Sequence, residues 1–421
     1  MNLSLERGRK GAEQPLVTIG IVSFKDKQYL EHCLPVFQHL NYPTGEPVRS
    51  GVAKKLTLRR SSKGAKVERP YYEILIFDNN PTKDISHWLN SKFPDIHVFG
   101  GGSNLGFGMA HNFLINQSKG DFYLCINSDV YPDKDFLKEL MLCIQKDSKI
   151  ACVTGKILAW RNVSTHPAGR PVRLRRIKKL TPPPQLYLNM LPERSPPRAD
   201  ERGEQSGYAS CETKRALQKK ERYIDTAGLV MHKNQRAADR FQNKKDEGKY
   251  EKEEEVWGCS AAACLFRMSA LKDVSCRQTV APKERRSAKK LRSRFGETTI
   301  NTKEYFDENF FMYKEDVDLA YRLRWAGWKS WYAPKAVAWH DRTVSEPVRL
   351  ELTSRHRGIT LSSIKERKNR SLLARKQSLL NQMLLVYKNW SKEYSIITKI
   401  KTYIFLMEYF LYVLFFDIKL L

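Results

Sequence analysis

The sequence lacks the marks of a disulfide-bonded or zinc-binding protein. None of its eight cysteines belongs to a Cys-x-x-Cys pair, and no cysteine–histidine spacing matches a zinc site. Most of the cysteines lie in apolar stretches, so we expect reduced core residues, which fits a cytosolic compartment. They are Cys33, Cys125, Cys143, Cys152, Cys211, Cys259, Cys264 and Cys276. Residues 1–15 also lack the apolar segment of a signal peptide, and we expect the bulk of the chain on the cytosolic side.

Negative charge is scarce relative to positive charge. The 421 residues include 74 Lys and Arg but 46 Asp and Glu, which gives a formal net charge of +28. Such an excess favours phosphates, anionic lipids or nucleic acid as partners without choosing among them. Much of it lies in three basic stretches, about 45–69, 161–222 and 277–303, which we interpret as surface insertions, the second partly disordered. Aromatic residues for base stacking are not interleaved with these basic residues, so we expect no nucleic-acid partner.

Strand-like and helix-like segments alternate through the first part of the chain, and no internal repeat is present. Apolar, β-branched runs predict strands at 16–24, 73–80, 96–100 and 122–130. Helical spacing predicts helices over 27–40, 110–120 and 133–145. This alternation indicates an α/β fold with a mostly parallel sheet. In such a sheet ligands bind beyond the carboxyl ends of the strands.

Polar residues follow two of these strands directly. Asp78 and Asn79 end the second strand, where a carboxylate and an amide either read the edge of a nucleotide base or form a turn. Asn127 and Asp129 end the fourth strand. A carboxylate there either holds a divalent cation against a diphosphate or caps the following helix.

A glycine-containing loop lies between these two strand ends. Gly106 would let the backbone approach a ligand closely, and Asn104 and Asn112 add hydrogen-bonding groups. The loop is not a dinucleotide fingerprint, because G-x-G-x-x-G is absent from the first strand-to-helix turn.

The segment 306–328 combines acidic and aromatic residues. Glu315 and Asp316 open a predicted helix that ends near Gly327. Acids in a first helical turn are common complements of the helix dipole, but a carboxylate beside aromatic rings also suits proton abstraction from a hydroxyl. A further strand, 331–340, ends at His340, which is of interest only if the fold brings it near Asp129.

Taken in order, these segments resemble the GT-A family 2 glycosyltransferases, especially the bacterial rhamnosyltransferase-like branch. LVTIGIVSF looks like the family's first strand and IFDNN like its base-reading strand end. GSNLGFGMAHN matches the loop N-x-G-F-x-x-x-x-N, and INSDV stands at the D-x-D or N-x-D metal motif. EDVDLAYR, followed by the distal histidine, matches the E-D-x-D-L-x-x-R helix. Together they cover roughly residues 16–160 and 223–345; one departure is Asn127, which stands where many members have an Asp.

The resemblance implies a metal-dependent enzyme that inverts the anomeric centre. Asp129 and His340 would hold Mg²⁺ or Mn²⁺, Asp316 would be the general base with Glu315 beside it, and Arg322 would orient the carboxylates or touch phosphate. The implied nucleotide-sugar-binding residues are Ser23, Asp78, Asn79, Asn104, Gly106, Phe107, Asn112, Asn127 and Arg322.

The resemblance also suggests substrates and a cellular role. The donor would be dTDP-rhamnose or a UDP-sugar, with rhamnose favoured, and the acceptor a glycan or lipid-linked molecule in cell-envelope polysaccharide synthesis. The alternative is a catalytically silent binding subunit. We expect a glycosyltransferase domain at 14–345 and a C-terminal helical segment at 346–421.

The C-terminal segment is basic, with apolar residues at helical spacing, and ends in the most apolar run of the chain. This pattern is typical of a helix on an anionic membrane surface. Glu408 and Asp417 are costly in hydrocarbon, so we favour docking over spanning and expect a protein peripheral to the inner face of the cell membrane. A helix packed on the protein itself is the other reading.

Overall fold

The computed structural model describes residues 16–42, 71–160, 222–277, 303–342, 371–391 and 394–417. The three predicted insertions therefore lie outside the described residues except at their edges, and so do Cys211 and the first part of the predicted C-terminal segment.

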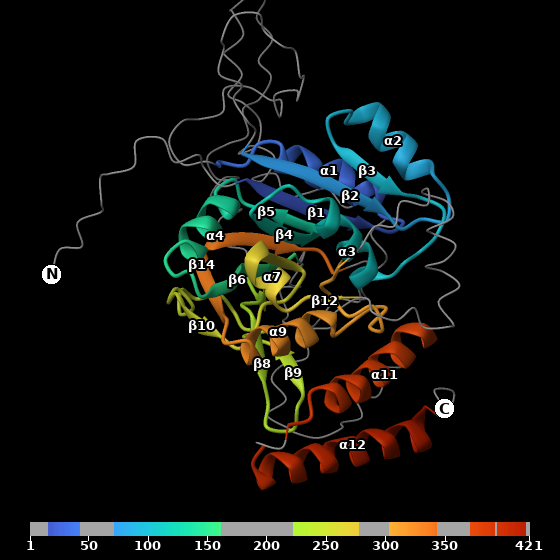
Figure 1. Ribbon diagram of the computed structural model, residues 1–421, viewed down its shortest axis with the longest axis vertical. Helices are drawn as coiled ribbons and strands as arrows, with labels where there is room; N and C mark the ends of the chain where they lie inside the picture. The colour runs from blue at the N-terminus through green and yellow to red at the C-terminus, as the bar shows by residue number, and fades with distance from the viewer. Residues whose placement is uncertain are drawn as a thin grey trace, which may run out of the picture.

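The centre of the molecule is a ten-stranded sheet (Figure 1). Its main path runs β10-β14-β6-β11-β4-β1-β2-β3, with β5 paired to β14 and β7 to β6. β3, β2, β1 and β4 are parallel, β6 and β14 run the same way, and β11 between them is antiparallel to both neighbours. The predicted α/β fold with a mostly parallel sheet is confirmed. The strands are β1 Val17–Ser23, β2 Tyr72–Asp78, β3 His97–Gly100, β4 Phe122–Asn127, β5 Val130–Pro132, β6 Ile150–Ala159, β7 Ile224–Thr226, β10 Glu254–Val256, β11 Ala263–Arg267 and β14 Lys329–His340.

Helices cover both faces of this sheet, because the side chains of each strand alternate between two apolar clusters. Ile19 and Ile21 of β1 belong to one cluster, while Tyr123 and Cys125 of β4 belong to the other. α1 and α4 pack on the first cluster, and α3 and α9 on the second. The helices are α1 Lys27–Phe37, α2 Asp84–Lys92, α3 Phe107–Gln117, α4 Phe136–Ile144, α7 Met268–Asp273 and α9 Glu315–Trp325. Short strand pairs β8 (Leu229–Met231) with β9 (Ala237–Asp239), and β12 (Cys276–Arg277) with β13 (Lys303–Glu304), complete the domain.

Two helices form the C-terminal part, α11 (Leu372–Lys388) and α12 (Ile396–Phe416). Leu385 of α11 is buried against Phe310 and Tyr321, so α11 packs beside α9. Tyr412 and Val413 of α12 pack on Leu379 of α11, which leaves α12 at the edge of the molecule (Figure 1). Within the described part of the chain, every helix is too short or too polar to cross a bilayer.

Local differences from the sequence prediction are few and have physical causes. The strand predicted over 122–130 ends at Asn127, and the chain turns through Ser128 and Asp129 before β5 pairs with β14. The helix predicted from residue 110 begins three residues earlier, at Phe107. The six cysteines that the structure describes fully are free and buried, as expected.

Candidate active site

Four strand ends meet at one edge of the sheet. The parallel register pairs Ser23 with Asp78 and Val22 with Asn127, so the ends of β1, β2 and β4 lie side by side. β14 ends at His340, which pairs with Val130 of β5. This pairing brings the distal histidine to the residue that follows Asp129, and the predicted candidates therefore converge in space.

Asp129 and His340 form the centre of a buried polar group. His340 Nε2 lies 3.3 Å from Asp129 Oδ1, and His340 Nδ1 lies 2.8 Å from Asp225 Oδ2. Arg342 Nε in turn lies 2.6 Å from Asp225 Oδ1. The imidazole is thus held in one orientation between two carboxylates. Sequence reasoning missed both Asp225 and Arg342.

This group fits a divalent cation. Burial alone lowers the pKa of His340, but Asp129 and Asp225 outweigh it and raise the pKa to about 10. A cation bound by Nε2 and Asp129 would take the place of that proton. The carboxylate oxygen suits Mn²⁺ or Mg²⁺, and a carboxylate on the far nitrogen of a ligating histidine is the usual supporting arrangement. Asp129 and His340 would be the ligands, and Asp225 would orient the imidazole.

A third acid, Asp26, connects the end of β1 to the turn that carries Asp129. Ser23 and Ser128 both donate hydrogen bonds to the Asp26 carboxylate, one to each oxygen. Burial raises the pKa of Asp26, against the lowering effect of these two hydroxyls. Sequence reasoning included Ser23 but missed Asp26. The available signal was its position, three residues after the first strand, which is the same criterion that selected Asp129.

The glycine loop is shaped by Asn79. Its Nδ2 donates to Gly106 O at 3.0 Å, and its Oδ1 accepts from Leu105 N at 3.0 Å. Gly106 has φ of +79°, and a Cβ there would lie 2.3 Å from Phe311 O. Phe107 N donates to Phe311 O at 3.0 Å, and Asn104 Oδ1 accepts from Gly106 N at 2.9 Å. The loop therefore rests directly on the segment that precedes the acidic helix.

Asp78 and Asn112 are also engaged within the protein. The two oxygens of Asp78 accept from the backbone and side chain of Asn80 and of Ser86. Asn112 Oδ1 accepts from the backbone N of Tyr305 and of Phe306, and its Nδ2 donates to Phe306 O at 2.7 Å. With these contacts, Asp78 and Asn112 shape the site by holding its backbone. For Asp78 the contacts are those of a turn, which is one of the two interpretations that the sequence left open.

The acid pair opens α9 as expected. Glu315 is buried and Asp316 is partly exposed. Asp316 Oδ2 accepts from Ala261 N at 3.2 Å, and Oδ1 accepts from Val317 N at 2.8 Å. Glu315 Oε2 has no hydrogen-bond partner among the described residues. Burial raises the pKa of both carboxyls, and the neighbouring Asp316 charge raises that of Glu315 further.

One turn connects the acid pair, Glu315 and Asp316, to the polar group formed by Asp129 and His340. Ala261 donates to Asp316, while the next residue, Ala262, accepts at 3.0 Å from the backbone N of Asn127. A partly exposed carboxylate therefore lies close to a candidate cation site, at the carboxyl edge of a parallel sheet.

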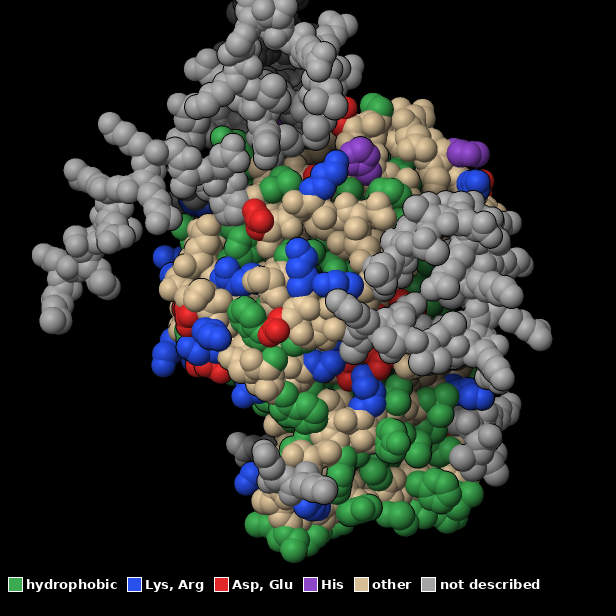
Figure 2. Space-filling model, in the orientation of Figure 1, with side chains coloured by type: hydrophobic (Ala, Val, Ile, Leu, Met, Phe, Trp, Pro, Cys, Tyr) green, Lys and Arg blue, Asp and Glu red, His purple; other side chains and the backbone are tan. Residues whose placement is uncertain are grey.

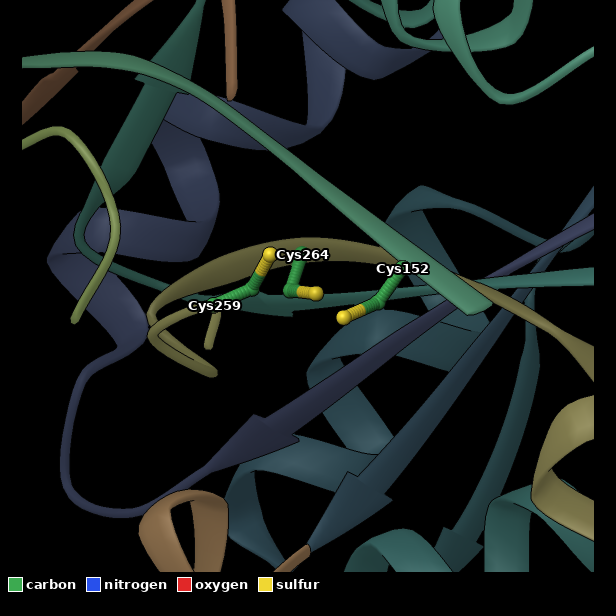
Figure 3. A group of neighbouring side chains, drawn as sticks. All are labelled: Cys152, Cys259 and Cys264. Carbon is green, nitrogen blue, oxygen red and sulfur yellow. The ribbon is translucent and has the colours of Figure 1, made fainter. Parts of the chain in front are cut away.

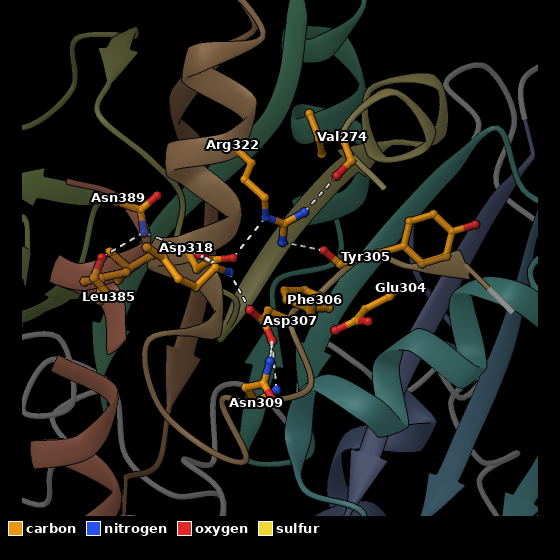
Figure 4. Close-up of polar contacts among 12 residues, drawn as sticks. Val274, Glu304, Tyr305, Phe306, Asp307, Asn309, Asp318, Arg322, Leu385 and Asn389 are labelled. Atoms are coloured by element: carbon orange, nitrogen blue, oxygen red, sulfur yellow. Dashed lines mark hydrogen bonds and ion pairs between the residues drawn. The ribbon is translucent and has the colours of Figure 1, made fainter. Parts of the chain in front are cut away.

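Arg322 lies on the side of α9 that faces Val274 and Tyr305 (Figure 4). Its Nε donates to Asp318 Oδ2 at 2.9 Å, and its terminal nitrogens donate to Val274 O and Tyr305 O. None of these three contacts reaches Glu315 or Asp316, so both roles that the sequence left open for Arg322 stay predictions.

Three buried thiols, Cys152, Cys259 and Cys264, also lie together (Figure 3). Metal ions bind thiolates, but burial raises the pKa of Cys259 and Cys264 well above the ordinary value, whereas hydrogen bonds from these two thiols lower the pKa of Cys152. Cys152, Cys259 and Cys264 point to Ser330 Oγ, Trp331 O and Leu265 O respectively. We interpret the cluster as part of the core.

One part of the chain matches a family model. Residues 55–193 match the model of "Glycosyl transferase family 2", a range that contains Asp78, Asn112 and Asp129. No curated protein matches the chain.

Three solved structures resemble the chain at low identity. GalNAc-T7 with UDP, GalNAc and Mn²⁺ is 11% identical over 91% of this chain, with a TM-score of 0.46. This chain spans 49% of that one, about half its length. The mannosyltransferase PcManGT from Pyrobaculum calidifontis, with GDP-Man and Mn²⁺, is 10% identical over 94% of this chain and 70% of that one, with a TM-score of 0.39. S. aureus TarS with UDP-GlcNAc is 17% identical over 39% of this chain and 38% of that one, with a TM-score of 0.26.

Proposed function

We propose that this chain, a glycosyltransferase of the GT-A fold with a family 2 domain, moves a sugar from a nucleoside-diphosphate donor with inversion of the anomeric centre. The observation that carries the proposal is the turn at Ala261 and Ala262, which holds Asp316 beside the strand end that bears Asp129. A base and a site for the diphosphate lie next to each other, and an inverting transfer needs both.

Asp316 is the residue we assign as general base. It is the partly exposed member of the acid pair, so it can reach an acceptor hydroxyl, while Glu315 is buried beneath it. The raised pKa of Asp316 makes it a better proton acceptor than an ordinary aspartate once it is ionised. The proton of the acceptor hydroxyl passes to an Asp316 oxygen as the hydroxyl oxygen attacks the anomeric carbon, and the bond from that carbon to the diphosphate oxygen breaks.

Asp129 and His340 hold the diphosphate end of the site. A Mg²⁺ or Mn²⁺ ion bound there would offset the charge that develops on the leaving nucleoside diphosphate. Asp225 keeps Nε2 of His340 directed at Asp129, and the hydrogen bond from Asn79 keeps the backbone of Gly106 in place. The proposed donor site is completed by Ser23, Asn104, Phe107, Asn112 and Asn127. Asp78 shapes the turn beside the nucleotide base.

The donor and acceptor we favour follow from the resemblance of the motifs. Rhamnose from dTDP-rhamnose is the leading sugar, with UDP-sugars next, and the acceptor is a glycan or lipid-linked molecule of the cell envelope. Residues 14–345 form the transferase domain and 346–421 a membrane-associated segment. We place the protein at the cytoplasmic side of the cell membrane, peripheral to its inner face.

A nucleotide-sugar screen tests the proposal. Each candidate donor is added with and without Mn²⁺, and the melting temperature and donor hydrolysis are measured. A donor that binds only the native state raises the melting temperature, and we expect this rise to require Mn²⁺. Donor binding without any hydrolysis or transfer would favour the silent binding subunit. The absence of both for every donor would overturn the proposed function.

A further inference from the structure

The helix that carries the proposed base contains a fully buried charge. Asp318 of α9 is 0% exposed, and a buried carboxylate needs cationic or hydrogen-bonding partners to remain ionised. Arg322, one turn along the same helix, supplies one partner at 2.9 Å. A second is Lys388, the last residue of α11, whose Nζ lies 2.7 Å from Asp318 Oδ1, and Asn389 Nδ2 donates to the same oxygen at 3.4 Å. Lys388 of a C-terminal helix therefore completes the charge balance around Asp318, whose ion pair with Arg322 is drawn in Figure 4.

Lys388 also reaches the segment that leads into this helix. Its Nζ forms an ion pair with Asp307, whose backbone O accepts from Phe310 N at 3.1 Å. Burial would raise the pKa of Asp307, but the Lys388 ammonium and the Asn309 hydrogen bonds together lower it. One ammonium thus ties Asp307, before the acid pair, to Asp318, after it. A cation at this point limits how far the two segments can move apart.

A second contact from α11 falls on strained backbone. Tyr313 and Lys314, the two residues before Glu315, have φ of +69° and +72°, which is unusual for residues with a side chain. Such backbone persists only where the surrounding structure holds it. Asn381 of α11 donates from Nδ2 to Met312 O at 2.7 Å and to Tyr313 O at 2.8 Å. The conformation that aims the acid pair is therefore held from the C-terminal helices.

The outer face of the neighbouring helix is apolar. Exposed residues recur along α12 at helical spacing, namely Ile396, Ile400, Tyr403, Met407, Phe410 and Leu414. Figure 2 shows hydrophobic side chains gathered over this end of the molecule. A helix with an apolar face that is turned away from the protein needs a partner to cover it.

The charges around this face point to one occupant, an anionic bilayer. Lys399 and Lys401 lie near the start of α12, and Glu408 is the single acidic residue within either helix. A second copy of the chain would bring the same basic residues together, whereas an anionic lipid surface would neutralise them.

We propose that the two C-terminal helices act as one unit, in which α12 rests on an anionic lipid surface and α11, through Asn381 and Lys388, positions the catalytic helix α9. The proposal rests on the assignment of Asp316 as the base and deepens it. Lys388 and Asn381 are positioning residues, because Lys388 touches the helix and Asn381 the segment before it, and neither touches the reacting atoms. An acceptor held in the membrane would then meet Asp316 at a fixed height above the surface.

Point variants of the full-length enzyme test the positioning role. Lys388→Met removes the ammonium and keeps the aliphatic stem, Lys388→Arg keeps the charge, and Lys376→Met is the matched control on the exposed side of α11. We expect Lys388→Met to lower kcat about 10-fold or more, because small displacements of a catalytic group are costly, with donor KM unchanged. Lys388→Arg should recover most of the loss, and Lys376→Met should behave as wild type.

Hydrogen exchange of residues 307–318 gives a readout that does not depend on the reaction. We expect faster exchange there in Lys388→Met and in Asn381→Leu, but not in Lys376→Met. Unchanged exchange and unchanged kcat in both variants would overturn the positioning role. If exchange responds but wild type transfers no sugar from any donor, the proposed function fails while the α11 contact stands.

Vesicle binding tests the lipid surface. Full-length protein is sedimented with phosphatidylcholine vesicles prepared with and without phosphatidylglycerol, at low salt. We expect binding only to the anionic vesicles and its loss in the double variant Ile400→Glu and Met407→Glu, while Leu142→Glu, an equally exposed change on α4, binds normally. Dimerisation through α12 without vesicle binding, or no binding at all, would overturn this half of the proposal. Deletion of residues 361–421 is a poorer test, because it removes both contacts together.

Discussion

The two sides of the proposed site satisfy their polar groups in opposite ways. On the nucleotide side, the polar atoms of Asp78, Asn79 and Asn112 are matched by partners in the chain. On the acid side, Glu315 has a buried oxygen without a described partner, and burial raises the pKa of both Glu315 and Asp316. Perturbed carboxyls mark chemistry, whereas satisfied amides mark shape. Substitutions should therefore affect turnover on one side and stability on the other.

The largest effect is expected from the base. Asp316→Asn keeps the shape and most of the hydrogen bonding but cannot take a proton. We expect turnover to fall at least about 10²-fold, with donor affinity nearly unchanged, because a base acts in the transition state. Steady-state kinetics together with donor titration checks this.

Glu315→Gln is the control for Asp316→Asn and should be milder. Glu315 is buried and is expected to orient its neighbour. Near-normal turnover in Asp316→Asn together with an inactive Glu315→Gln would reverse the two roles. If both variants remain active, this helix does not carry the base. The contrast between the two sides of the site would then not hold.

The next effect concerns the cation group. Asp129→Ala should abolish metal-dependent donor binding without unfolding the protein. At a donor concentration about 100 times Kd, wild type gains about 2.7 kcal/mol of stability, which the variant should lose. Thermal shift with and without Mn²⁺ measures the difference, and Asp135→Asn, on the exposed N-terminus of α4, should respond as wild type. An Mn²⁺-dependent shift that survives in Asp129→Ala would contradict the assignment.

Much of the fold was predictable because its signals are local. Apolar β-branched runs gave β1, β2 and β4 to within three residues. Helical spacing gave α1, and the start and stop signals at Glu315 and Gly327 gave α9. β11 was not predicted, because its five residues sit antiparallel between β4 and β6, and that placement depends on pairing partners far away in the sequence. The break at Ser128 was missed because the apolar pattern resumes at once in β5.

The candidate site was predictable in its members but not in their partners. Strand-end reasoning selected Asp129 and Asp78, and the helix pattern selected Asp316. Neither signal could select Asp225 or Lys388, since neither residue stands at a strand end. Their importance comes from contacts with His340 and Asp318. Nor could either signal show that Asn112 serves the backbone at Tyr305 and Phe306, almost 200 residues away. The roles of the residues themselves stay predictions until kinetics test them.

A smaller effect, on stability, is expected at the glycine loop of the nucleotide side. Gly106 has φ of +79°, and a Cβ would lie 2.3 Å from Phe311 O, a backbone atom that cannot move aside easily. Gly106→Ala should lower the free energy of unfolding by about 1–3 kcal/mol. Gly108→Ala is the matched control, because it is helical and its nearest contact is 3.2 Å, so its change should be smaller. Chemical denaturation measures both. Equal losses would mean that the loop conformation is not what Gly106 secures.

The smallest effect also belongs to the nucleotide side and appears with pH. His111 of α3 is fully buried against Tyr123 and Cys125, and burial lowers its pKa to about 3. An unfolded histidine titrates near 6.5, so between these values the unfolded chain binds a proton that the folded chain does not. This stability is therefore fully present above about pH 6.5 and is lost progressively as the pH falls toward 3. One unit below 6.5, the loss is about 1.4 kcal/mol.

Denaturation at pH 7.5 and at about one unit below the unfolded pKa measures this slope. We expect His111→Gln to be less stable at neutral pH, because it disturbs a packed site, but to lose less on acidification than wild type. His97→Gln, at an exposed position in β3, should keep the wild-type slope. If His111→Gln and wild type lose equal stability between the two pH values, His111 is not the group that takes up the proton. The acid sensitivity would then have to come from the carboxyls of the other side, where the raised pKa values of Glu315 and Asp316 predict the opposite sign, because these carboxyls hold protons in the folded chain that the unfolded chain has released.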